Sequence, residues 1–144
     1  VRKHRYDTIV EGIGLDRLTA NFLKADIDHA FRIPDQATVH MAHYLLKNEG
    51  LFVGSSSAIN CVGAVLAAKH LGPGHTIVTI LCDSGQRHRS RLWSQKFIKD
   101  FGLQWPEPAQ VASLDFLSGT MKNTKTTGVK RQQEQPPLVR PNQT

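Results

Sequence analysis

The chain has 144 residues and 40% apolar content, which is enough for the core of one small globular domain. Its net charge of +6 is confined to the two ends, where residues 1–7 carry +2 and residues 121–144 carry +4, so the neutral middle excludes an extended basic surface for nucleic acid. No apolar run approaches the roughly 20 residues of a membrane span, and two cysteines without CxxC spacing favour a reducing, intracellular setting.

The first predicted elements are two short extended segments. Within residues 6–14, the β-branched run from Thr8 to Val10 favours a strand, and Gly12 then allows the chain to turn. A second extended piece is predicted at residues 30–34. Only the charged stretch VRKHR precedes the first segment, so this strand is expected to pair with strands of a missing N-terminal half.

The next element is a long helix that begins at a proline and ends at a glycine. Pro34 suits a first helical turn and Asp35 suits a cap, while Gly50 suits the residue that ends a helix. His40 and His43 stand three residues apart on this helix, but no third metal ligand is in register with them. They are therefore interpreted as two exposed histidines and not as a metal site.

A strand, a helix and a second strand follow in close succession. They are predicted at residues 51–53, 55–71 and 75–82. The last of these is apolar almost throughout, which is typical of a parallel strand that is covered on both faces. The order indicates a βαβ unit and an α/β fold, in which both strands end at the same edge of a parallel sheet.

The remainder of the chain contains less regular structure. Residues 94–102 form a short amphipathic helical pattern. From residue 119 to residue 144 the composition shifts to Thr, Lys, Gln and Pro, which is typical of a disordered basic tail. The sequence therefore divides into one folded part, residues 1–118, and the tail.

Three glycine-bearing loops are predicted to meet where the parallel strands end. They contain Gly12, Gly54 and Gly85, and ligands of open α/β sheets bind at this edge. In the loop GSSSA, Ser55 or Ser56 would also serve as an ordinary helix cap. The loop lacks the Gly-Lys-Ser/Thr ending of a phosphate loop, and GIGLDR lacks the third glycine of a dinucleotide fingerprint.

A serine hydrolase is the competing interpretation of the same loop. Ser56 follows a strand and precedes a helix, as a nucleophile does in α/β-hydrolases, and Asp83 and His88 follow in the usual order. The spacing argues against this reading, because Asp83 and His88 lie five residues apart on one loop. The acid and the histidine normally come from separate loops.

Four motifs together resemble one enzyme family. They are EGIGLDRLTANF, EGLFVGSSSAINCVGAV, LGPGHTIVTILCDSGQRH and FGLQWP, and the resemblance runs from about residue 6 to residue 106, roughly two thirds of the chain. In this order they resemble the C-terminal part of the cysteine synthase and cystathionine beta-synthase family. These are pyridoxal-phosphate enzymes of fold type II, whose sheet and flanking helices this chain would share in part, with residues 1–118 belonging to the large cofactor domain.

The resemblance implies a cofactor-side role for residues of two loops. A serine at the position of Ser56 lends its hydroxyl to the pyridine nitrogen of pyridoxal 5'-phosphate, and Ser57 matches a small residue under the ring. A neutral hydroxyl holds the pyridine proton less firmly than a carboxylate does, which suits β-elimination and β-replacement. Gly54 belongs to the same loop, Asp83 and Ser84 come to the same edge, and Ser55 is expected to cap the helix.

The resemblance also implies a substrate-side loop. Gly12, Ile13 and Gly14 match the segment that walls the substrate entrance in relatives, where glycine lets the backbone approach closely. The implied substrates are serine or O-acetylserine with sulfide or a thiol. Asp83 stands where sulfhydrylases often carry serine and follows the cystathionine-synthase pattern, so the choice of substrate stays open.

Several parts of the family's active site have no counterpart in this sequence. The Schiff-base lysine, the substrate loop with its asparagine and the glycine-threonine phosphate cup are all absent. The expectation is therefore a C-terminal fragment of a β-replacement enzyme, inactive by itself, whose parent forms a homodimer in the cytoplasm or mitochondria. A non-catalytic partner-binding module and the serine hydrolase stay open as alternatives.

Overall fold

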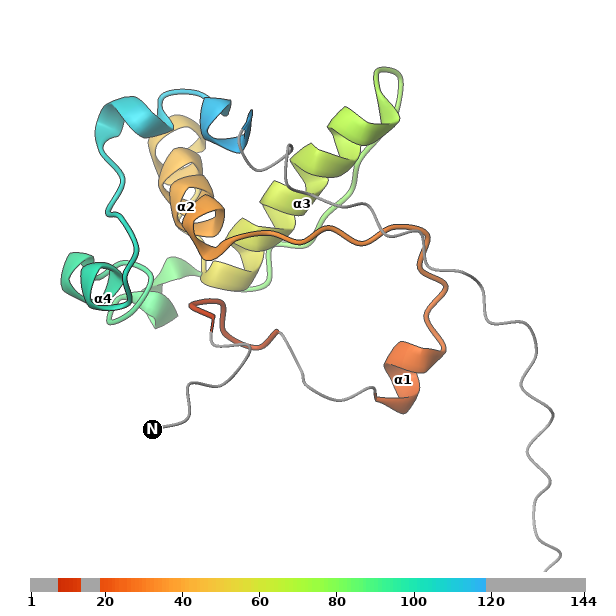
Figure 1. Cartoon of the computed structure of the whole chain (residues 1–144), viewed down its shortest axis with the longest axis horizontal. Helices are drawn as coiled ribbons and strands as arrows, with labels where there is room; N and C mark the ends of the chain where they lie inside the picture. Colours follow the sequence, from red (N-terminus) through yellow and green to blue (C-terminus); the bar gives the residue numbers. More distant parts are fainter. Residues whose placement is uncertain (1–7, 14–18, 119–144) are drawn as a thin grey trace, which may run out of the picture.

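The computed structural model describes residues 8–13 and 19–118. Two long helices dominate them: α2 (Asp35–Glu49) and α3 (Ser55–Leu71). Figure 1 shows the shorter elements α1 (Ala20–Leu23) and α4 (Gln95–Asp100) on either side of this pair. The remaining helical turns are of the 3-10 type: η1 (Gly85–His88), η2 (Pro108–Val111) and η3 (Asp115–Leu117). None of these helices is long and apolar enough to cross a membrane.

Local signals set the ends of α2 as the sequence predicts, with one difference. Gly50 ends the helix in the left-handed conformation, with φ of 69°. Pro34 is the N-cap residue, one position earlier than expected, and Asp35 is the first helical residue. The Asp35 carboxylate does not cap the helix; it accepts hydrogen bonds from Thr8 Oγ1 at 2.5 Å and the Ile9 amide at 3.0 Å.

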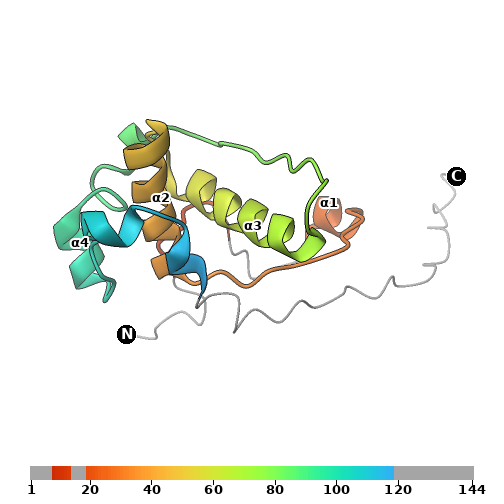
Figure 2. The same cartoon turned by 90° about the horizontal axis from the view of Figure 1, so that it is seen from above.

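The core lies where α2 crosses the N-terminal end of α3, as Figure 2 shows. Both helices bury apolar residues at helical spacing, and on α3 these are Ala58, Val62 and Leu66. Other segments fill the space between and beside the helices. Their fully buried side chains are Ile9, Leu92, Ile98 and Leu117.

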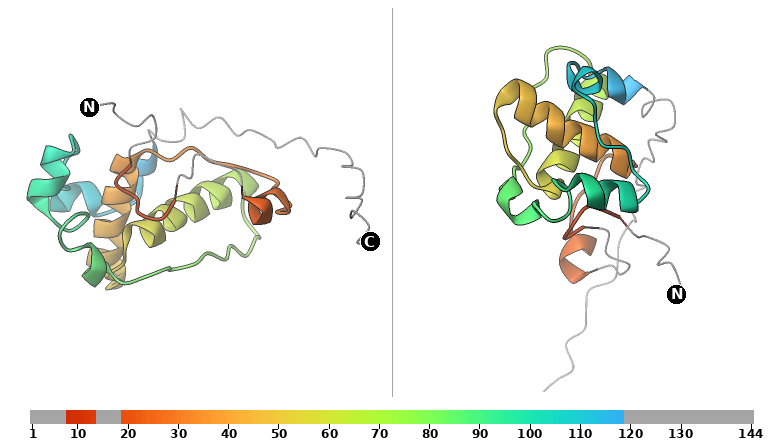
Figure 3. Two further views of the ribbon diagram at one scale, coloured as in Figure 1. Left: turned by 90° about the horizontal axis from the view of Figure 1, so that it is seen from below. Right: turned by 90° about the vertical axis from the view of Figure 1, so that its left-hand side faces the viewer.

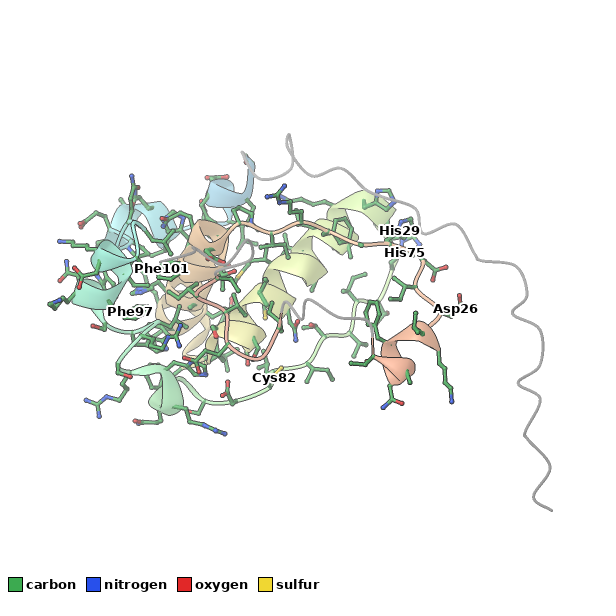
Figure 4. All side chains as sticks on the ribbon, turned by 60° about the horizontal axis from the view of Figure 1, so that its bottom comes forward. Asp26, His29, His75, Cys82, Phe97 and Phe101 are labelled. Atoms are coloured by element: carbon green, nitrogen blue, oxygen red, sulfur yellow. The ribbon has the colours of Figure 1, made fainter. Side chains whose placement is uncertain are left out.

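The helix α4 forms where the sequence predicts a short amphipathic helix. Ser94 caps it, because its hydroxyl accepts a hydrogen bond from the Phe97 amide at 3.3 Å. Ile98 is its buried residue. Phe97 and Phe101, labelled in Figure 4, stack with 5.9 Å between ring centroids.

The predicted sheet is not formed within the described residues. The segments at 8–10 and 75–82 contain no strand, and Val53 and Ser84 form an isolated antiparallel bridge. Extended backbone becomes a strand only when a neighbour pairs with it, and none of the described segments lies in position to do so. The order of extended segment, helix and extended segment is present, but without the ladder of a βαβ unit.

The extended segment 75–82 runs back beside α3, from the end of the helix to its beginning. Residues 24–34 pass along the opposite side of α3 (Figures 2 and 3). Val78 and Ile80 are 84% and 65% exposed, so the prediction of a strand covered on both faces is wrong for this structure. Two side chains of α3 hold the segment: Asn60 donates to the Ile80 carbonyl at 3.0 Å, and Ser57 Oγ accepts from the Cys82 amide at 2.8 Å.

Candidate functional site

Loops from distant parts of the sequence meet at the N-terminal end of α3. The Gly54 amide donates to the Asp83 carbonyl at 3.0 Å. The Glu11 amide donates to Ser55 Oγ at 3.1 Å, across 44 residues of sequence. The predicted convergence of the three glycine-bearing loops is therefore confirmed, although no sheet edge holds them.

The three adjacent serines at the start of α3 have different surroundings. Ser55 is fully buried, and its hydroxyl accepts the Glu11 amide. Ser57 is also fully buried, and its hydroxyl accepts the Cys82 amide. Ser56 is half-buried, and its hydroxyl has no hydrogen-bond partner among the described residues. Of the three hydroxyls, only that of Ser56 is available to a ligand.

The cap predicted at Ser55 is wrong. Gly54 is the N-cap residue of α3, Ser55 is already the first helical residue, and no side chain caps this end of the helix. The first turn of a helix presents N–H groups without intrahelical partners and carries the positive end of the helix dipole. The half-exposed Ser56 hydroxyl thus stands at an end that favours electron-rich atoms.

Glycine is needed at position 54 because there is no room for a Cβ atom, and not because of the backbone conformation. Its φ of −80° suits any residue, but a Cβ there would overlap with Asp83 Oδ1 and lie 2.5 Å from His88 Nε2. Protein atoms essentially never approach so closely, so even alanine would push the loops apart. The glycine lets the 83–88 loop pack directly on the start of α3.

A cluster of charged side chains around the buried His88 joins these loops, and we call it the loop clamp: Glu11, Asp83, His88 and Arg91. His88 is 3% exposed, and its Nε2 lies 2.9 Å from Asp83 Oδ2. Its Nδ1 lies 3.9 Å from Glu11 Oε2, and Arg91 Nε lies 3.1 Å from Glu11 Oε1. The Arg91 N–H does not point at that oxygen, so this contact is an ion pair without a hydrogen bond.

Sequence reasoning found part of this cluster and assigned it differently. Asp83 and His88 were placed together as the acid and base of a hydrolase, and they do form a pair. Among the described residues no hydrogen bond joins His88 to Ser56, because both ring nitrogens face carboxylates. Glu11 and Arg91 are not predicted as site residues from the sequence. Their charge and their position near the Gly12 and Gly85 loops are the signal that could have indicated them.

The other predicted site residues that the structure describes are exposed residues near the start of α3. Ser84 is exposed, and its hydroxyl accepts the Gln86 amide at 3.3 Å as the cap of η1. Gly12 is exposed with φ of 79°, a conformation that favours glycine. Ile13 is 43% exposed and lines a groove of about 420 Å³ between α3 and the extended segment. Gly14 lies outside the described residues.

The two histidines of α2 are not exposed, so that prediction is wrong. His43 packs against Trp93 and Trp105, with ring centroids 4.8 Å and 4.4 Å away. Burial, and then repulsion by His40, lowers the pKa of His43 to about 4. In the described ranges, no three side chains of His, Cys, Asp or Glu are placed to hold a metal ion.

Comparison with known proteins identifies the family to which this chain belongs. Residues 1–83, more than half of the chain, match the family model described as pyridoxal-phosphate dependent enzyme. The chain therefore belongs to this family, whose cofactor is pyridoxal phosphate.

The relatives that resemble this chain include cysteine synthases and a cystathionine beta-synthase. The chain is 52% identical to cysteine synthase 2 of Schizosaccharomyces pombe over 81% of this chain and 29% of the relative. It is 56% identical to cysteine synthase of Dictyostelium discoideum over 74% of this chain and 28% of the relative. The chain is 35% identical to cystathionine beta-synthase of Dictyostelium discoideum over 68% of this chain and 20% of the relative. The chain thus spans less than a third of the length of these relatives.

The described residues fit one end of the family's cofactor. A hydroxyl without a partner at an uncapped helix N-terminus suits the nitrogen of a pyridine ring. The neighbouring carboxylate of Asp83 pairs with His88 through Oδ2, while its Oδ1 is buried without a hydrogen-bond partner among the described residues.

Proposed function

We propose that this chain supplies the ring-side part of the cofactor site in an enzyme that makes cysteine from serine or O-acetylserine and sulfide. The observation that carries the proposal is the distribution of the three serine hydroxyls. Two are buried and used to join loops, while that of Ser56 has no partner among the described residues. Cysteine synthases among the relatives, at 52% and 56% identity, support the reaction class.

Each predicted residue has a distinct task in this proposal. The Ser56 hydroxyl would hold the ring nitrogen of pyridoxal 5'-phosphate, which supplies an electron sink for exchange of the β-substituent when bound. Gly54 and Ser57 shape the first turn of α3 around that hydroxyl. Asp83 and Ser84 hold the adjoining loop, Asp83 through His88 and Ser84 as the cap of η1.

On the substrate side, Gly12, Ile13 and Gly14 would border the entrance for the amino acid. Ile13 contributes an apolar wall to the groove beside α3, and Gly12 keeps the backbone open to close approach. The amino-acid donor and the sulfide or thiol acceptor are not distinguished by these residues.

The complete enzyme needs groups that this sequence does not contain. The lysine that carries the cofactor and the phosphate cup have no counterpart in the 144 residues, so the chain by itself is proposed to be inactive. A homodimeric parent in the cytoplasm or mitochondria is part of the same proposal. The extended, exposed segment 75–82 is consistent with a chain whose sheet partners are supplied elsewhere.

The test is a chimera in which the matched segment of this chain replaces that of Schizosaccharomyces pombe cysteine synthase 2. We expect the chimera to bind pyridoxal phosphate and to form cysteine. Ser56→Ala should retain the cofactor, change its absorption spectrum and lower kcat by about twofold to tenfold, the effect of losing one hydrogen bond between neutral groups. Ser90→Ala, which changes an exposed serine, is the matched control.

Other outcomes separate the alternatives. A chimera that folds without binding the cofactor would contradict the proposal and favour a partner-binding module. Ester hydrolysis by the unmodified chain that disappears in Ser56→Ala would favour the hydrolase. A chimera that binds the cofactor and is indifferent to Ser56→Ala would overturn the role of Ser56.

A further inference from the structure

The loop clamp is built so that one imidazole faces two carboxylates. His88, in η1, is buried between Asp83 at the end of the extended segment and Glu11 in the N-terminal loop. Arg91 is the remaining charged group of the cluster, and it faces Glu11. The first turn of α3, which packs against the cluster through Gly54, contributes no acidic side chain.

The number of protons on the ring decides how many of these contacts it can make. A carboxylate oxygen only accepts hydrogen bonds, and a neutral imidazole has a single N–H. The 2.9 Å contact to Asp83 uses the hydrogen on Nε2. Nδ1 is buried without a hydrogen-bond partner among the described residues, 3.9 Å from Glu11 Oε2. Only the protonated ring can donate to both carboxylates at once.

We propose that His88 is a positioning residue whose second proton draws Glu11 inward and so holds the substrate-side loop, residues 11–13, against the start of α3. The substrate-side role of this loop rests on the proposed function. The contacts between His88, Glu11 and the start of α3 do not depend on it. The loop has two other described anchors at this point, the bond from the Glu11 amide to Ser55 and the ion pair between Glu11 and Arg91. When the ring is neutral, Glu11 keeps only its ion pair with Arg91, which is 41% exposed.

The consequence for the site is a loop whose position depends on pH. Ile13, two residues from Glu11, forms part of the groove wall. In this proposal, movement of Glu11 would displace Ile13 and so would change the width of the groove where the amino-acid substrate would enter. Ser56 does not take part, so the ring-nitrogen contact would be the same in both states.

The experiment uses the full 144-residue chain labelled with ¹⁵N. Long-range ¹H–¹⁵N NMR of the imidazole gives the protonation state of His88, and backbone amide shifts report residues 11–13, both followed from about pH 8 to about pH 5. We expect the loop amides to shift with the same midpoint as the His88 ring. In Glu11→Gln, which retains the size of the side chain, the loop amides should lose this shift. His70→Gln is the matched control and should leave the loop amides unchanged.

Two results would overturn the proposal. One is a set of loop amides that does not follow the His88 ring in the unmodified chain. The other is a pH-dependent loop shift that persists in Glu11→Gln. No cofactor is present in this measurement, so its failure leaves the role of Ser56 untouched, and failure of the chimera leaves the clamp untouched.

Discussion

The burial of His43 between two tryptophans predicts a specific loss of stability in acid. Burial holds the pKa of His43 at about 4 in the folded chain, below the value of 6.5 that the group has when unfolded. The unfolded chain therefore binds a proton more readily than the folded chain between these values. The contribution of His43 to folding is complete above pH 6.5, declines as the pH falls towards 4, and is lost below that.

The magnitude follows from the size of the pKa change. At about 1.36 kcal/mol for each pKa unit, a lowering from 6.5 to about 4 corresponds to at most about 3.4 kcal/mol. The ring is only partly buried, so solvent screening reduces this, and we expect about 1–2 kcal/mol. His43→Phe should remove this part of the pH dependence, because Phe does not titrate and His43 Nε2 has no hydrogen-bond partner among the described residues to lose.

Urea unfolding followed by far-ultraviolet circular dichroism measures the effect. The free energy of unfolding of the unmodified chain and of His43→Phe is compared at about pH 7 and about pH 4. Circular dichroism is preferred to fluorescence, because protonation of His43 would itself change the emission of Trp93 and Trp105. His70→Phe is the control for a histidine at the exposed end of α3. Equal pH dependence in the unmodified chain and in His43→Phe would refute the reasoning.

Three further changes test the packing around the site, each by urea unfolding. Gly54→Ala should destabilise the chain by about 1–3 kcal/mol, because the added Cβ overlaps with the loop clamp. Gly63→Ala is the control and should not destabilise it, because the added Cβ meets one side-chain atom at 3.8 Å. Equal effects of the two substitutions would contradict this prediction. Leu66→Ala truncates a side chain that is 4% exposed and should lower the free energy of unfolding by about 2–5 kcal/mol. A smaller loss would mean that α3 is not packed as described. Ser55→Ala removes the acceptor of the Glu11 amide and should lower stability by about 1–3 kcal/mol and accelerate hydrogen exchange at that amide; unchanged exchange would exclude the bond.

The two long helices could be predicted because their signals are local. Gly50 and Gly72 end α2 and α3, and apolar residues recur at helical spacing between their ends. The predicted range for α3, residues 55–71, is the observed one. Such signals act within one or two turns of the backbone, so they need no knowledge of the rest of the fold.

The pairing of strands in a sheet could not be predicted from such local signals, because the two paired strands are far apart in the sequence. The segment 75–82 has the composition of a buried strand, but composition does not supply the neighbour with which it pairs. In the structure its backbone is held by the side chains of Ser57 and Asn60 in place of a second strand. The fold type is established by the family match, and the arrangement of its strands stays a prediction.

The site was predicted in outline, and the errors arise from contacts across long stretches of sequence. The hydroxyl of Ser55 was expected to cap its own helix, but the amide of Glu11, 44 residues away, occupies it. His43 was expected to be exposed, but Trp105 covers it. Neither contact leaves a periodic trace in the sequence, since each depends on how loops return to the two helices.

The role of Ser56 is tested most directly by observing the ring nitrogen of the cofactor. In the chimera loaded with pyridoxal phosphate labelled with ¹⁵N in the ring, the ¹⁵N shift reports the hydrogen bond to that nitrogen. We predict a clear change of this shift in Ser56→Ala and none in Ser90→Ala. The same ¹⁵N shift in all three proteins would contradict the assignment of Ser56 to the cofactor ring.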